Sequence, residues 1–256
     1  MKELTGRPGT DVSAFCPSFS VKMKEPALEL SPRLDAAAAL VRPGARLVDV
    51  GTDHAHLPAF LASAGKIEKA LATDVADGPV KRARATVARC GLEDVVAVRK
   101  APGLSGAKSF DPTDIVIAGM GGELISAILE EARGWLSPEI RLILQPMTKE
   151  AALRAYLARK GFAIEREEIV PEGRRLYTLI VCRATGAPYA LSPLEELIGP
   201  RNLEKEGGEI VALLEKKLKE LKRSAEGKER GGVLTDSDRA VISALILEMQ
   251  KRGVDP

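Results

Sequence analysis

Long hydrophobic runs, cysteine and histidine are scarce in this sequence, and each scarcity excludes a class of protein or site. No run of about 18 or more apolar residues occurs, which argues against a membrane-spanning helix. The three cysteines, Cys16, Cys90 and Cys182, form no CxxC pair, so we expect neither disulfides nor zinc, and a reducing compartment such as the cytoplasm is favoured. The two histidines, His54 and His56, have no clustered partner ligands, so no metal is predicted.

What is present is typical of a folded, highly charged chain. Of the 256 residues, 45% are hydrophobic and 29% are charged, which is enough for one large or two modest domains. The net charge of +2 neither requires nor excludes a nucleic-acid partner. Residues 1–26 are polar and interrupted by prolines, with no apolar signal core, so we expect a flexible leader there.

Residues 46–56 carry the most informative pattern in the chain. A short apolar, β-branched run (residues 47–50) ends abruptly at Gly51, and an apolar helical stretch follows at residues 57–64. A strand, a tight glycine turn and a helix in this order form the layout that binds a cofactor beside a helix N-terminus. Asp74 ends a second predicted strand 23 positions after Gly51, close to the roughly 20-residue spacing of a carboxylate that binds a ribose diol.

The turn itself favours a cationic cofactor without phosphates. It has one glycine and a carboxylate, Asp53, where a dinucleotide-binding turn has glycines that approach a pyrophosphate. Asp53 would repel phosphate and suit a sulfonium or ammonium group, so the turn favours S-adenosylmethionine and methyl transfer over a dehydrogenase. An ordinary α/β turn without a ligand is the alternative interpretation.

The remaining pattern predicts an α/β fold with a doubly wound, seven-stranded Rossmann-like methyltransferase sheet and a C-terminal α-helical hairpin. Five strands alternate with helices, as expected for a parallel sheet, and a β-hairpin closes it. The expected strands are 47–50, 70–75, 95–99, 115–118, 142–144, 162–170 and 175–183. The expected helices of this part are 27–41, 57–64, 79–90, 123–133 and 149–159.

We therefore divide the chain into a leader (1–26), a methyltransferase domain (27–186) and a helical hairpin domain (187–256). A linker is expected at 191–200, followed by an amphipathic helix at 203–223. Glycines 227, 231 and 232 are expected to form a turn before a second helix capped by Thr235. The hairpin is either a stabilising or dimerising appendage, or an arm that grips a large substrate. The chain is expected to be a monomer, with a dimer through the hairpin as the alternative.

Ligands of open α/β sheets bind at the carboxyl ends of the strands, which selects the candidate site residues. Asp74 should bind the ribose hydroxyls, whereas Asp53 and His54 should line the methionine end of the cofactor. His54 is either a general base or a hydrogen-bonded structural residue. The full cofactor-binding prediction is Asp49, Gly51, Thr52, Asp53, His54, Asp74, Val75, Gly103, Leu104, Gly119, Met120 and Gly121.

Short motifs spread over residues 30–183 complete the pattern. They are Val48–His54, Leu57-Pro58, Asp74-Val75, Gly78-Pro79, Ile117–Ile125, Leu142–Pro146 and Tyr177. Together they resemble the bacterial tRNA (adenine-22 N1)-methyltransferases, whose two-domain plan also includes a C-terminal helical hairpin. The resemblance implies methylation of N1 of a tRNA adenine with S-adenosylmethionine, giving 1-methyladenosine.

This chemistry needs alignment rather than a strong base, because the N1 lone pair of neutral adenine can attack the methyl group directly. The catalytic prediction is accordingly Gln145, Pro146, Met120 and Gly121, which would hold and orient the base. The predicted tRNA contacts are Arg33, Lys81, Arg82, Arg84, Gly122 and Gln145. Solvated surface charge is the alternative for each of the basic residues.

The chain departs from the family pattern in two places. Ala101-Pro102-Gly103-Leu104 stands where the family usually has Gly-Asp-Gly-Leu, so a carboxylate that helps to hold the cofactor's adenine is missing. His56 stands where an aromatic residue such as tyrosine is expected. A small-molecule methyltransferase of the same fold and a non-catalytic protein that binds RNA or cofactor therefore remain as alternatives.

Overall fold

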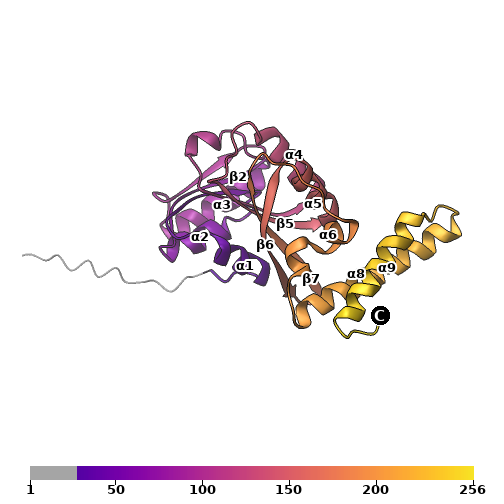
Figure 1. The fold of residues 1–256 in the computed structure, drawn as a ribbon. Helices are drawn as coiled ribbons and strands as arrows, with labels where there is room; N and C mark the ends of the chain where they lie inside the picture. Colours follow the sequence, from indigo (N-terminus) through magenta and orange to yellow (C-terminus); the bar gives the residue numbers. More distant parts are fainter. Residues whose placement is uncertain (1–27) are drawn as a thin grey trace, which may run out of the picture.

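The computed structural model describes residues 28–256, so the predicted leader lies outside the described residues. In this part of the chain, none of the helices combines the length and the apolar character that a membrane crossing requires. The fold is a seven-stranded sheet between two layers of helices, from which a helical hairpin extends (Figure 1).

The sheet has the strand order β3-β2-β1-β4-β5-β7-β6. Strands β1 to β5 are parallel to one another, whereas β7 pairs antiparallel with both of its neighbours, β5 and β6. The strands are β1 (Ala45–Val50), β2 (Ile67–Asp74), β3 (Val96–Lys100), β4 (Asp114–Gly121), β5 (Arg141–Thr148), β6 (Phe162–Glu172) and β7 (Arg175–Ala184). The predicted seven-stranded methyltransferase sheet is confirmed.

Helices cover both faces of this sheet. Their bounds are α1 (Pro32–Leu40), α2 (His56–Ser63), α3 (Asp77–Cys90), α4 (Gly122–Ala132) and α5 (Glu150–Arg159). The side chains of β1 alternate between the two layers: Val48 packs with the core under α4 and α5, whereas Leu47 packs with the core under α1 to α3. The order of the strands reverses at β1, where β2 lies on one side and β4 on the other.

Strands β4 and β5 extend beyond their predicted ends at residues 118 and 144. Bulges between Ala118 and Gly121 let the two strands stay paired through Met120 and Pro146. Pro146 is tolerated because β7 pairs with β5 only at residues 142–144, so no ladder on that side needs its missing N–H. The predicted glycine and proline breaks were wrong for this reason, and the two extended strands carry the candidate residues to the edge of the sheet.

The segment predicted as a linker is helical instead. It contains α6 (Pro193–Ile198) and α7 (Pro200–Leu203), and α6 begins with a capping box in which Ser192 and Glu195 satisfy each other's backbone N–H groups. The hairpin that follows consists of α8 (Gly208–Arg230) and α9 (Asp236–Lys251), the latter capped by Thr235 as predicted. Gly227 lies inside α8 rather than in the turn, so the prediction for that glycine was wrong.

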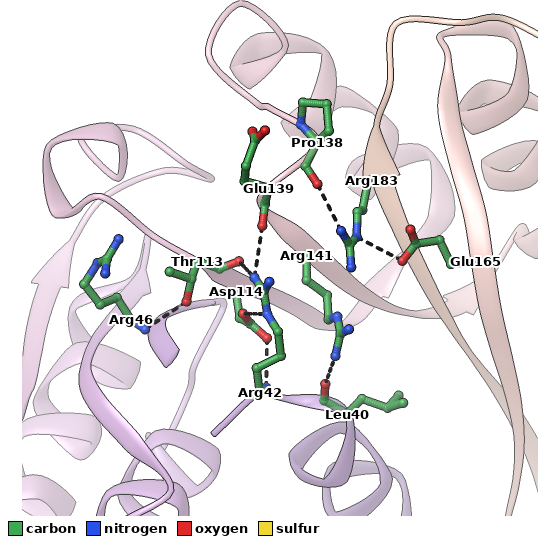
Figure 2. A network of polar contacts seen from close by, with 10 residues as sticks. All are labelled: Leu40, Arg42, Arg46, Thr113, Asp114, Pro138, Glu139, Arg141, Glu165 and Arg183. Carbon is green, nitrogen blue, oxygen red and sulfur yellow. Dashed lines mark hydrogen bonds and ion pairs between the residues drawn. The ribbon is translucent and has the colours of Figure 1, made fainter. Parts of the chain in front are cut away.

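The amino-terminal ends of the strands are closed by a network of arginines (Figure 2). Asp114 is fully buried and accepts a 2.7 Å hydrogen bond from Arg42 Nε, while Arg42 also donates to the carbonyl of Glu139. Arg141 donates to the carbonyl of Leu40, which joins α1 to β5. These bonds join the end of α1 to β4 and β5 at this edge of the sheet.

Candidate cofactor and substrate site

A cavity of about 340 Å³ opens at the carboxyl edge, where the strand order reverses. This is the place where open α/β sheets bind ligands. Its walls come from the first turn of α1, the turn after β1 and the end of β4. The lining residues are Arg33, Leu34, Asp49, Gly51, Thr52, Asp53, His54, His56, Leu57, Ala118 and Gly119.

The turn after β1 has a tightly constrained backbone. Gly51 has a φ of +74°, and a Cβ there would lie 2.2 Å from the methyl carbon of Met120. Asp53 and Ala55 also have positive φ values, 47° and 55°, which non-glycine residues rarely adopt. Strained backbone of this kind clusters at functional sites. The turn therefore holds Asp53 and its neighbours in a fixed arrangement around the cavity.

Asp49 is a nearly buried carboxylate at the base of this cavity. Its Oδ2 accepts a 2.5 Å hydrogen bond from the Thr52 hydroxyl. Burial raises the pKa of Asp49 to about 6; the Thr52 hydrogen bond opposes this rise, and the nearby charge of Asp74 adds to it. A cation that enters the cavity would favour the ionised form, so Asp49 is suited to a positively charged ligand.

Two further carboxylates stand at the rim. Asp53 Oδ1 lies 2.5 Å from Arg82 Nη2 of α3, and its other oxygen lies 3.6 Å from His54 Nε2. Asp74 accepts hydrogen bonds from the backbone N–H groups of Ala76 (3.0 Å) and Asp53 (3.4 Å). Val75 follows at 62% exposure, so an apolar side chain is available beside a carboxylate that can accept from a diol.

His56 contributes a neutral ring to the cavity. Its ring centroid lies 5.1 Å from that of His54. Burial lowers the pKa of His56, and the charges of His54 and Arg89 lower it further, against a smaller opposing effect of Asp53. His56 was not among the site residues predicted from the sequence.

Of the glycines at the end of β4, Gly119 alone faces open space. Its φ is +78°, and no atom of residues 28–256 lies within 4 Å of an added Cβ. By contrast, a Cβ at Gly122 would lie 2.5 Å from the carbonyl oxygen of Lys149, and one at Gly121 would lie 3.3 Å from the Thr148 hydroxyl. Gly121 and Gly122 therefore allow β4 and α4 to pack against the end of β5, whereas Gly119 leaves room for a ligand.

The Gln145 side chain holds the backbone at the end of β4 in place through hydrogen bonds. Gln145 is 1% exposed; Oε1 accepts a 3.0 Å hydrogen bond from the Gly119 N–H, and Nε2 donates to the Pro146 carbonyl. The amide is thus engaged in holding the backbone of β4. Met120 is half-buried and packs on Gly51, while Pro146 is buried.

The loop after β3 approaches the site through its backbone. The N–H of Ala101 donates to the carbonyl of Asp74 at 3.0 Å, which places the loop beside the end of β2. Leu104 is buried in the core, and Gly103 lies against Ile128 with a φ of +49°. Pro102, at the position of the missing carboxylate, is exposed.

The predicted basic residues separate into two groups. Arg33 and Arg82 flank the site: Arg33 lines the cavity, pairs with Glu172 and lies 5.6 Å from the centre of the Tyr177 ring, while Arg82 holds Asp53. Lys81 and Arg84 are exposed on another face of α3.

Three apolar lining residues were not predicted. Leu57 and Ala118 belong to motifs that were identified in the sequence but were not assigned to the site, whereas Leu34 was indicated only by its position beside Arg33. Across residues 28–256, no group of three or more histidine, cysteine, aspartate or glutamate side chains is arranged to hold a metal ion.

The sequence matches the methyltransferase-domain family over residues 30–180. The tRNA (adenine(22)-N(1))-methyltransferase of Bacillus subtilis (strain 168) is 37% identical over 157 residues, which span 61% of this chain and 66% of that relative, just under two thirds.

Solved structures match over a larger share of the chain. A candidate tRNA (m1A22) methyltransferase of Streptococcus pneumoniae, in complex with S-adenosyl-L-methionine, has 35% identity and a TM-score of 0.74, and the match covers 84% of this chain and 100% of that one. The B. subtilis m1A22 tRNA methyltransferase TrmK has 30% identity and a TM-score of 0.73, with 88% of this chain and 98% of that chain covered.

Proposed function

Because this chain belongs to the methyltransferase-domain family, and within it to the family of the tRNA (adenine-22 N1)-methyltransferases, we propose that it transfers a methyl group from S-adenosylmethionine to N1 of an adenine in tRNA. The product is 1-methyladenosine at position 22 of the tRNA. The curated relative and the two solved structures carry this activity in their names.

One observation of this chain carries the proposal: the cavity at the strand-order reversal gathers carboxylates and offers no phosphate-binding glycine loop. Asp49 and Asp53 line it, and Asp74 stands at its rim on the next strand. A ligand with a sulfonium, an ammonium group and a ribose but no phosphate fits this set of donors and acceptors. The buried Asp49 carboxylate, whose one side-chain partner within residues 28–256 is Thr52, fits the cationic end of such a ligand.

Different residues of the cavity would bind different parts of the cofactor. Asp74 would accept from the ribose hydroxyls, and Val75 would pack on the adenine ring of the cofactor. Asp49, Thr52, Asp53 and His54 would surround the methionine end. When bound, S-adenosylmethionine supplies an electrophilic methyl group on its sulfonium.

The target adenine needs orientation and a dry site, since its neutral N1 carries the lone pair that attacks. Gly119 leaves room for a flat base against the end of β4, and Gln145 fixes the backbone at this point through the Gly119 N–H. We therefore assign Gln145 a positioning role, together with Met120, Gly121, Gly122 and Pro146. His56 adds a neutral aromatic surface to the same cavity.

The proposed RNA partner accounts for the basic residues around the site. Arg33 and Arg82 flank the cavity, Lys81 and Arg84 extend along α3, and a duplex base must leave its stack to enter. Lys219, Lys222 and Arg223 of α8 are exposed along a cavity of about 400 Å³, which Glu215, Glu226 and Asp255 also line, and the three cations would offer a second set of phosphate contacts. We place the enzyme in the cytoplasm as a monomer without a metal.

The test is incubation with labelled S-adenosylmethionine and unmodified tRNA, followed by nucleoside mass spectrometry. We expect 1-methyladenosine at position 22, and none in a tRNA that carries guanine there. Cofactor binding without any label in RNA would overturn the assignment of the acceptor and favour a small-molecule substrate. Absence of cofactor binding by calorimetry would overturn the enzymatic proposal.

A further inference from the structure

The side chain of Arg33 is held in one place at the wall of the cavity. Arg33 lies in the first turn of α1, and its side chain is 28% exposed. Glu172, the last residue of β6, binds it twice: Oε2 accepts a 3.2 Å hydrogen bond from the Arg33 backbone N–H, and Oε1 pairs with Nη1 of the guanidinium. The guanidinium therefore lines the cavity in an arrangement that Glu172 fixes.

The ring of Tyr177 supports the same guanidinium. Tyr177 is 8% exposed in β7, and the guanidinium carbon of Arg33 lies over its ring, 5.6 Å from the ring centre. A guanidinium is planar and stacks on aromatic faces. Leu30, just before α1, packs in the same core as Val170 of β6, which keeps the start of α1 beside the two strands. Arg33 thus connects the buried ring of Tyr177 to the cavity.

This arrangement suits a flat, neutral group better than a phosphate. Glu172 already compensates the charge of Arg33, so a phosphate would have to compete with a carboxylate for the guanidinium. By contrast, arginine guanidinium planes stack on unpaired bases. Gly119, which leaves room for a flat base, lines the same cavity as Arg33. The cavity therefore offers a stacking surface and space for a base.

The ion pair also matches the charge that the proposed reaction creates. The N1 lone pair of adenine forms a bond to the methyl carbon while the carbon–sulfur bond breaks, and the electron pair of that bond remains on sulfur. Positive charge thereby moves from sulfur to the adenine ring. An unpaired guanidinium against that ring would repel the growing charge, whereas the Glu172 carboxylate offsets this repulsion. We therefore expect Glu172 to affect the rate of methyl transfer more than the binding of tRNA.

We propose that the guanidinium of Arg33 is the surface on which the target adenine stacks. Tyr177 and Glu172 are positioning residues: Tyr177 supports the guanidinium plane, and Glu172 fixes it and compensates its charge. The role of Arg33 is thereby narrowed from a contact with tRNA phosphates to a contact with the base. The inference rests on the proposed methylation of a tRNA adenine.

Arg33→Lys separates stacking from phosphate binding, because it keeps the charge and removes the plane. We expect kcat/KM for tRNA to fall at least tenfold, with an unchanged salt dependence of tRNA binding. Arg46→Lys is the matched control, since Arg46 is 27% exposed, pairs with Asp111 and lies at the amino-terminal edge of the sheet (Figure 2). It should keep kcat/KM within twofold. Melting temperatures report whether each variant folds.

Glu172→Gln tests the charge compensation, since glutamine keeps an acceptor for Arg33 and loses the negative charge. We expect the single-turnover rate of methyl transfer at saturating tRNA to fall at least fivefold, whereas Kd for tRNA does not rise. A purely structural residue would not separate the rate from binding in this way. Asp111→Asn is the matched control and should change neither quantity. Tyr177→Leu should lower the rate, and Tyr177→Phe, which keeps the ring, should restore it.

Binding without methyl transfer tests the stacking surface separately. Parent and Arg33→Lys are compared by filter binding, with S-adenosylhomocysteine present, on two tRNAs: one with adenine at position 22 and one with an abasic nucleotide there. Arg33→Lys should weaken binding of the adenine-containing tRNA at least fivefold. Its binding of the abasic tRNA should stay within twofold of the parent.

The outcomes separate this proposal from the proposed function. If Arg33→Lys keeps the parent's kcat/KM and Arg33→Ala lowers the slope of log K against log salt concentration by about 1, Arg33 is a phosphate contact and the proposal is wrong. If Glu172→Gln raises Kd and leaves the rate unchanged, the positioning role of Glu172 is overturned. If the parent transfers no methyl group to tRNA, the proposed function fails. Equal weakening of both tRNAs by Arg33→Lys would overturn the stacking surface in either case.

Discussion

At the scale of single residues, the three carboxylates of the site have different surroundings and should behave differently. Among the described residues, Asp49 is buried and accepts from one hydroxyl, Asp53 is paired with Arg82, and Asp74 accepts only from backbone N–H groups. Asp74 thus keeps acceptor capacity for a ligand, whereas Asp49 is the group whose charge depends on pH near neutrality.

Asp74→Ala should weaken binding of S-adenosylmethionine by about 1.5–3 kcal/mol, roughly 10- to 150-fold in Kd, because it removes a charged acceptor for the ribose hydroxyls. Calorimetry on the variant measures this. Asp77→Ala is a matched control, since Asp77 is a nearby acid whose side chain is 86% exposed and paired with Lys100. An unchanged Kd for Asp74→Ala would show that the ribose binds elsewhere.

Cofactor affinity should fall as the pH falls from 7 to 5. The folded pKa of Asp49 is about 6, so the carboxylate that attracts the cationic cofactor becomes protonated in this range. The loss approaches about tenfold in Kd per pH unit below that pKa. Calorimetry at several pH values should show that Asp49→Asn flattens the profile. A double replacement of His54 and His56 by Gln should keep it; if instead that variant flattens the profile, the titrating group is a histidine.

The same group affects stability with a defined sign. Because the pKa of Asp49 is raised from 3.8 to about 6 by folding, its neutral form favours the folded state. That contribution is fully present below about pH 4 and is lost as the pH rises through about 6. Thermal unfolding of the cofactor-free protein should therefore show that Asp49→Asn gains stability relative to the parent at pH 8 and not at pH 4. An equal gain at both pH values would exclude titration of Asp49 as the cause.

At the scale of elements, the exposed cations of α3 differ in whether they contact the site. Arg82 reaches Asp53 in the turn after β1, whereas Lys81 and Arg84 are exposed without that contact. All three residues were predicted as RNA contacts, because helical spacing in the sequence does not show which face of α3 meets the cavity.

Substitutions of Lys81 and Arg84 should affect tRNA binding alone, whereas substitution of Arg82 should also affect cofactor binding. Replacing Lys81 and Arg84 by Ala should lower tRNA affinity and reduce the slope of log K against log salt concentration by about 2, with no change in cofactor binding. Arg82→Ala should also weaken cofactor binding, because Asp53 loses its partner. Filter binding over a salt series and calorimetry measure the two effects. Identical effects of both variants on cofactor binding would contradict the division.

The ends of β4 and β5 show why sequence reading places some elements only approximately. The apolar cores of both strands were predicted, because they are buried on both faces and lack alternation. Their extensions through Gly119 and Pro146 depend on pairing between two segments more than 20 residues apart, with bulges that local patterns do not encode. By contrast, the capping box of α6 is visible in the sequence as Ser192 and Glu195. The prolines at positions 193 and 200 nevertheless led to the prediction of a linker.

At the scale of the whole molecule, the lysines of α8 have two different roles, which depend on the elements packed against them. The sequence shows a run of cations on one amphipathic helix, which indicates a charged surface without specifying what it faces. The structure turns Lys216 and Lys217 toward β7 and α5, and leaves Lys219 and Lys222 exposed. The pairing of Arg154 with Glu167 was equally beyond the sequence, because it forms only when α5, β6 and the bend before α7 pack together.

The outer cations should therefore bind RNA while the inner ones hold the hairpin in place. Replacing Lys219, Lys222 and Arg223 by Glu should weaken tRNA binding at least tenfold at physiological salt, with unchanged cofactor affinity and melting temperature. The control is a triple replacement by Glu that changes the net charge by the same amount but lies on the sheet domain, away from α8. It uses Lys108, Arg133 and Arg159, which are exposed near the amino-terminal ends of the strands. Equal losses in both triple variants would mean that net charge, rather than the position of the cations on α8, determines tRNA affinity.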